Sequence, residues 1–99
     1  MNIYINKINI IGEAIYYQVS LAGSNETFYI GVYPDKQKIA FYKTKEFVNP
    51  IKIIDLSDPQ KHFDSIPGID LAISNRVCFQ VYKAIQERQF PESLSYEYH

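Results

Sequence analysis

The side chains best suited to metal binding or acid–base catalysis gather between positions 53 and 70. They are Asp55, Asp58, Asp64, Asp70 and His62. Carboxylates and imidazole bind metal ions and transfer protons, so this segment could hold a metal site or an acid–base pair. The spacing does not match an EF-hand loop, and no second histidine stands one helical turn away. Because Asp58 and Asp70 precede predicted helices, which aspartate caps well, we interpret the group as structural and expect no metal ion or cofactor.

The remaining catalytic candidates are isolated. Cys78 is the only cysteine, so an internal disulfide is excluded, and we interpret it as a buried small residue rather than a nucleophile. His99 is the last residue, and no other candidate stands near it. The chain contains no Gly-rich phosphate loop and no GxSxG, HExxH or CxxC motif. The sequence therefore predicts a protein that is not an enzyme.

Tyrosine is the most distinctive residue type, with nine copies in a chain that has no tryptophan. Four copies fall out of phase with the aliphatic residues of the predicted strands, namely Tyr16, Tyr29, Tyr33 and Tyr42. They should project from neighbouring strands onto the sheet face away from the core. A rigid ring with a hydroxyl that tolerates water makes this face a candidate protein-binding surface or homodimer interface. The alternative is structural, because tyrosine has high β-propensity and forms cross-strand pairs.

Lysines dominate the segment from 36 to 52. Lys36, Lys38, Lys43, Lys45 and Lys52 stand there against Glu46 alone, and Tyr33 and Tyr42 lie beside them. Basic residues with interleaved aromatic rings are the ingredients of single-stranded nucleic-acid binding. No arginine accompanies them, no RNA-recognition motif is present, and lysines on a hairpin also protect a strand edge from aggregation. Nucleic-acid binding is therefore the second hypothesis.

Length and composition set the class of protein. The 99 residues fit one domain, with 46% hydrophobic and 21% charged residues, as is ordinary for a globular protein. A formal net charge of −1 supplies no overall attraction to nucleic acid or to an anionic membrane. No long apolar run predicts a membrane span, and no basic leader with an apolar stretch predicts a signal peptide. We expect a cytoplasmic protein without a membrane partner.

Strands are predicted for most of the first half of the chain. Alternation covers 2–11, 14–22, 27–33 and 39–42, and a short edge strand is expected near 51–56. The phase of the isoleucines changes at Asn6 and Lys7, which predicts a β-bulge. The tail from Ser93 to Tyr98 alternates too, so it could rejoin the sheet. The most secure expectation is a meander of three consecutive antiparallel strands.

The period becomes helical from Asp70 to Gln89. One apolar stripe contains Ile73, Val77, Val81, Ala84 and Ile85, with Cys78 and Tyr82 at its margin. Pro91 is expected to end this helix. A turn or two of helix should begin at Asp58 and Pro59 and stop at Pro67. Phe79 lies on the polar face, where either this short helix covers it through Phe63 and Ile66 or a partner does.

These patterns predict one α+β domain spanning residues 1–99. Its antiparallel sheet of four to six strands carries the long C-terminal helix on one face and leaves the other face to water or to a partner. We hypothesise a small protein-binding protein that acts by occlusion, such as an inhibitor, a toxin-immunity protein or an adaptor subunit. Its predicted contacts are Tyr16, Tyr29, Tyr33 and Tyr42. Its partner is another protein or a second copy of the chain.

Overall fold

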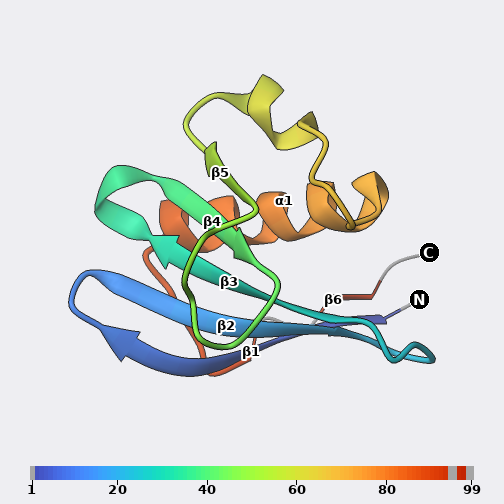
Figure 1. Cartoon of the computed structure of the whole chain (residues 1–99). Helices are drawn as coiled ribbons and strands as arrows, with labels where there is room; N and C mark the ends of the chain where they lie inside the picture. The colour runs from blue at the N-terminus through green and yellow to red at the C-terminus, as the bar shows by residue number, and fades with distance from the viewer. Residues whose placement is uncertain (1, 94–95, 98–99) are drawn as a thin grey trace.

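Antiparallel strands form one sheet, and a single long helix covers one of its faces (Figure 1). The computed structural model describes residues 2–93 and 96–97. The strands are β1 (Asn2–Ile11), β2 (Ala14–Leu21), β3 (Thr27–Tyr33), β4 (Lys38–Tyr42), β5 (Lys52–Asp55) and β6 (Tyr96–Glu97), and the helix is α1 (Leu71–Glu87). Their order across the sheet is β5-β4-β3-β2-β1-β6. The predicted α+β class and the antiparallel meander are confirmed.

Alternation along the central strands separates a core face from an outer face. Tyr17 and Val19 of β2 point to the core, and their partners Ile30 and Phe28 on β3 are buried with them. On β4 the buried core residues are Ile39 and Phe41. Because side chains alternate along a strand, a residue directly before or after a core residue faces away from α1. The predicted tyrosines all occupy positions of this outward parity.

The predicted bulge in β1 is present, shifted by about one residue. The register slips between Lys7 and Asn9, so Lys7 lies opposite Tyr17 whereas Asn9 lies opposite Tyr16. The extra residue is Ile8, which is exposed. A bulge of this kind re-aims the side chains that follow it. It leaves Lys7 on the core side of the sheet, with its side chain largely buried.

Helix α1 supplies the other half of the core. Its buried residues are Ile73, Ser74, Val77, Cys78, Val81, Ala84 and Ile85, which include the whole predicted stripe. Asp70 caps the helix, since its side chain accepts a hydrogen bond from the Ala72 N–H at 2.9 Å. The helix lies behind the sheet in Figure 1, against the aliphatic face. No helix among residues 2–93 and 96–97 has the length and apolarity to cross a lipid bilayer.

The short helix η2 (Pro59–Phe63) packs against α1. Asp58 caps it as expected, accepting from the Gln60 N–H at 3.1 Å. The side-chain amide of Asn75 donates to the His62 carbonyl at 2.9 Å, which ties η2 to the first half of α1. His62 is buried there, with Nε2 2.8 Å from the Leu56 carbonyl and its ring edge-on to Tyr82. The histidine thus belongs to the packing between these elements.

Pro91 does not end α1, contrary to the prediction. The last helical residue is Glu87, because Arg88 adopts the left-handed conformation at φ 53°. Its N–H bonds the carbonyls of Ala84 and Ile85, and the Gln89 N–H also bonds Ala84. These bonds satisfy carbonyl groups at the helix end and turn the chain before it reaches the proline. The stop signal is therefore a left-handed cap at a residue that rarely supplies one.

Lys7 and Tyr17 hold the chain that follows α1. The Lys7 ammonium donates to the Phe90 carbonyl at 2.6 Å, and the Lys7 backbone N–H donates to the Glu92 carbonyl at 2.7 Å. The Tyr17 hydroxyl donates to the Pro91 carbonyl at 3.4 Å. These bonds lead the chain back to the free edge of β1, where β6 pairs with it. The predicted return of the tail is confirmed for residues 96–97, whereas Leu94, Ser95 and Tyr98 of the predicted segment lie outside the described residues.

Candidate functional site

The sheet register gathers the four predicted tyrosines on the outer face. Tyr29 of β3 lies directly opposite Tyr42 of β4, and Tyr16 of β2 lies opposite Gly31, the residue between Tyr29 and Tyr33. All four rings are therefore neighbours on the side away from α1. Tyr16, Tyr29 and Tyr33 are half-buried, while Tyr42 is only 5% exposed. The prediction of a shared face is right, but this face is less open than expected.

Phe47 covers part of the tyrosine face. Its ring centroid lies 4.2 Å from that of Tyr16, and it meets Tyr29 and Tyr42 edge-on at 5.9 Å and 5.4 Å. Figure 1 shows why, because the connection from β4 to β5 crosses the sheet on the side opposite α1. We call Tyr16, Tyr29, Tyr33, Tyr42 and Phe47 the aromatic face. The expectation that only water or a partner would meet this side of the sheet was wrong.

Gly31 makes room for the aromatic face. A Cβ atom at this position would lie 2.9 Å from Cε1 of Tyr16 and 3.4 Å from Cε2 of Tyr42. The first separation is shorter than ordinary van der Waals contact, so the two rings use the space above the glycine. Ala40, the partner of Gly31 on β4, is also small and is buried. The small residues of β3 and β4 form the floor on which the aromatic rings pack.

Hydrogen bonds link the hydroxyl groups at one end of this face. Tyr33 is hydrogen-bonded to Tyr16 and to Tyr42. The bond to Tyr33 and burial raise the pKa of Tyr16. The bond from Tyr16 lowers the pKa of Tyr33, but burial and the bond to Tyr42 outweigh it, and the net shift is upward. Both phenols therefore stay neutral at physiological pH and can offer hydrogen bonds alongside apolar ring surface.

The connection that carries Phe47 has an unusual backbone. Phe47 and Asn49 both lie in the left-handed region, at φ 55° and φ 54°. This region costs roughly 1–2 kcal/mol for a residue with a Cβ, and it is rarer for a bulky residue than for asparagine. The contacts of the Phe47 ring must offset that cost. Strained backbone of this kind is concentrated at functional sites, which makes this segment part of the candidate site.

Two substitutions at Phe47 separate the ring contacts from the backbone strain. Phe47→Ala should lower the free energy of unfolding by about 2–3 kcal/mol, because it removes three aromatic contacts and apolar burial. Phe47→Gly removes the same ring but relieves the left-handed strain, so its cost should be about 1 kcal/mol smaller. Urea unfolding of both variants measures the difference. If glycine costs more than alanine, the strain argument is wrong.

Exposed aliphatic residues border the aromatic face. Val48 follows Phe47 in the chain and is 62% exposed. Ile53 of β5 lies opposite Ala40, which puts it on the same side of the sheet as the tyrosines, and it is 56% exposed. Phe47, Val48 and Ile53 were not among the site residues predicted from the sequence. An apolar pair in the otherwise polar 43–50 connection is the signal that could have found the first two.

Most of the predicted lysine segment has carboxylates nearby. Lys36 pairs with Glu13 at 3.1 Å, and Lys52 lies 3.9 Å from Asp64. Lys38 stands opposite Asp55 in the register of β4 and β5. These carboxylates offset the positive charge that residues 36–52 carry when their sequence is considered by itself. The arrangement weakens the electrostatic basis for a nucleic-acid interface.

The acidic residues and Cys78 are occupied by structural roles. Asp58 and Asp70 cap helices, and Asp55 accepts a 2.6 Å hydrogen bond from the Ser57 hydroxyl. In the part of the chain that the structure describes, no three histidine, cysteine, aspartate or glutamate side chains are grouped as metal ligands would be. Cys78 is fully buried in the core. Burial, followed by the charge of Asp64, raises the pKa of its thiol to about 12, so the nucleophilic thiolate is suppressed at neutral pH.

Phe79 is not covered by the short helix, which was one of its two expected covers. Its ring is 61% exposed and Phe63 of η2 is 66% exposed, whereas Ile66 is buried. Asn75 and Tyr82 of α1, rather than Phe79, provide the contacts to η2.

Comparison of the chain with protein families, curated proteins and solved structures finds no match. Function is therefore argued from the geometry of the chain.

Proposed function

We propose that this is a small protein-binding protein that acts by occlusion, in the manner of an inhibitor, a toxin-immunity protein or an adaptor subunit. The observation that carries the proposal is the aromatic face, bordered by exposed Val48 and Ile53 on the side of the sheet that α1 leaves free. Protein interfaces are enriched in aromatic residues, and tyrosine is common among their energetic hot spots. The arrangement supplies such residues on a rigid sheet.

The geometry suits a preformed contact surface. The tyrosine rings are held by cross-strand pairing and by Phe47, so a partner would not have to order them on binding. Preorganisation of this kind reduces the entropic cost of association. The neutral hydroxyls of Tyr16 and Tyr33 add polar contacts to an apolar surface. The proposed occlusion therefore needs no catalytic group.

We also propose that the protein is cytoplasmic. The free thiol of Cys78 is compatible with a reducing compartment. Nucleic-acid binding has less support than protein binding, because Lys36, Lys38 and Lys52 have carboxylates beside them. The partner is then another protein or a second copy of this chain.

A charge-insertion pair tests the proposal. Val48→Asp with Ile53→Asp places two charges at the border of the aromatic face, at positions exposed enough to accept them with little effect on the fold. The protein enriched from the native host by the wild type should be purified, and its affinity measured by calorimetry. The double variant should bind it about 30-fold or more weakly, which is the loss expected at an interface hot spot.

Phe79→Asp is the matched control. It inserts one carboxylate, half the charge of the double variant, at a residue of nearly equal exposure, 61%, but on α1 rather than on the outer face. This variant should retain wild-type affinity and wild-type thermal stability. A partner that is lost on Phe79→Asp and kept by the double variant would move the interface to the helix and contradict the proposal. Sedimentation of the wild type shows in addition whether the partner is a second copy.

A further inference from the structure

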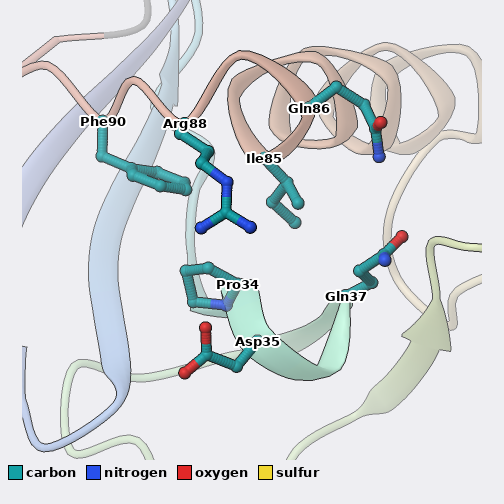
Figure 2. Close-up of a pocket in the computed structure, with 7 residues that line it drawn as sticks. All are labelled: Pro34, Asp35, Gln37, Ile85, Gln86, Arg88 and Phe90. Atoms are coloured by element: carbon teal, nitrogen blue, oxygen red, sulfur yellow. The ribbon is translucent and has the colours of Figure 1, made fainter.

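A cavity of about 400 Å³ lies between the C-terminal turn of α1 and η1 (Pro34–Lys36) (Figure 2). This volume falls within the usual range of small-ligand pockets, roughly 300–1,000 Å³. The cavity shares no residue with the aromatic face, and it lies on the side of the sheet that carries α1. It is therefore independent of the proposed protein-binding surface.

Two opposite charges face this cavity without pairing. Figure 2 shows the Arg88 guanidinium reaching from the end of α1 toward Pro34, with the Asp35 carboxylate below it. The structure describes both side chains and gives neither an ion-pair partner. The Arg88 backbone is fixed by the helix cap, because its N–H bonds the carbonyls of Ala84 and Ile85. A donor fork and a carboxylate thus lie on opposite walls of one space.

The other walls supply apolar surface and neutral amides. Ile85 and the Phe90 ring line the helix side of the cavity, and Pro34 lies on the η1 side. Gln37 and Gln86 face the same space from η1 and α1 in Figure 2. Gln37 is the left-handed cap of η1, at φ 52°, and its N–H bonds the Pro34 carbonyl, which fixes the start of its side chain. Such a site combines apolar contact with a few placed polar groups, as ligand pockets do.

We propose that this cavity binds a small zwitterion of the free α-amino acid type. The guanidinium of Arg88 would bind its carboxylate, since arginine presents paired donors that match a carboxylate. Asp35 would accept from its ammonium group, and the side chain would lie against Pro34, Ile85 and Phe90. The charges of the lining residues cancel, which disfavours a simple anion through Asp35 and a simple cation through Arg88. The charge pattern therefore selects a ligand with both groups.

Titration by NMR tests this site directly. Glycine, L-leucine and L-glutamine are the probes, each added up to about 20 mM to the ¹⁵N-labelled protein. At least one should shift the side-chain amides of Gln37 and Gln86 and the Arg88 Nε–H saturably, with a dissociation constant on the order of 1 mM. The N-acetyl derivative and the amide of that probe each lose one charge. Each should bind about tenfold or more weakly.

Variants from both walls complete the test. Arg88→Gln and Asp35→Asn should each weaken the probe about tenfold or more, because each removes a charge-assisted hydrogen bond. Lys83→Gln removes a cation from the same helix outside this cavity and should leave binding unchanged. The two binding variants lie on different elements, so a folding defect in one leaves the other as a test. The proposal is overturned if no probe gives saturable shifts, or if the variants and uncharged derivatives bind like their parents.

Discussion

Raising the pH above 9 should destabilise this protein steeply, because two buried groups ionise only at the expense of the fold. Cys78 and Tyr17 are fully buried. Burial, with a smaller contribution from the charge of Asp64, raises the pKa of the Cys78 thiol from 9.0 to about 12. Burial, with a smaller contribution from the charge of Glu92, raises the pKa of Tyr17 from 10.0 to about 12. Both groups are neutral when protonated, so the folded state holds their protons more tightly than the unfolded state.

The direction of the effect follows from proton linkage. Below pH 9 both states are protonated at Cys78, and its contribution to stability is complete. Between pH 9 and 12 the unfolded state loses this proton and the folded state keeps it, so the free energy of unfolding falls by about 1.4 kcal/mol per pH unit. Tyr17 adds a similar slope between pH 10 and 12. Complete loss of both contributions corresponds to about 7 kcal/mol, which is comparable to the stability of a whole small domain.

Urea unfolding at intervals from pH 7 to pH 11 measures this slope. Cys78→Ala should have a shallower curve above pH 9, and Tyr17→Phe a shallower curve above pH 10. The comparison uses slopes, because Cys78→Ala also leaves a small cavity that lowers stability at every pH. The variants serve as controls for each other, since each retains the other group. If Cys78→Ala follows the wild-type slope between pH 9 and 10, the thiol is not the titrating group.

Gly31→Ala should destabilise the wild type but not a variant that lacks the Tyr16 ring. In the wild type the added methyl group would lie 2.9 Å from Tyr16 Cε1, so the ring must shift from the position in which it packs against Phe47. Overpacking of this kind costs about 1–3 kcal/mol. In a Tyr16→Ala background the closest remaining ring contact is with Tyr42 Cε2 at 3.4 Å, an ordinary van der Waals distance. There Gly31→Ala should be neutral, or stabilising by up to about 1 kcal/mol, because alanine loses less backbone entropy than glycine in a strand.

A double-mutant cycle of urea unfolding curves measures this coupling. The four proteins are the wild type, both single variants and the double variant. The interaction energy should be about 1–3 kcal/mol, with the double variant more stable than the sum of the single effects predicts. Additive effects would show that the Tyr16 ring does not depend on the missing side chain at Gly31. The cycle therefore tests whether the aromatic face is packed as the structure shows.

Local and periodic features of the chain were readable from the sequence. Alternation placed Tyr17 and Val19 in the core and Tyr16 on the opposite face, because the two-residue period of a strand is set by backbone geometry. The helical period identified the buried stripe of α1. Asp58 and Asp70 indicated where the helices begin, because a side-chain oxygen at the N-cap accepts hydrogen bonds from nearby backbone N–H groups. Each of these signals depends only on residues close together in the chain.

The tertiary structure decided what covers each face and which distant residues meet. The sequence predicted a free tyrosine face, but the 43–50 connection places Phe47 over it, and an aperiodic connection carries no signal of where it will pack. Phe79 is exposed because η2 contacts α1 through Asn75 and Tyr82 instead. Arg88 and Asp35 face one cavity only because the chain folds them together. Periodicity determined which side of each strand or helix is buried, whereas long-range packing determined which other element that side contacts.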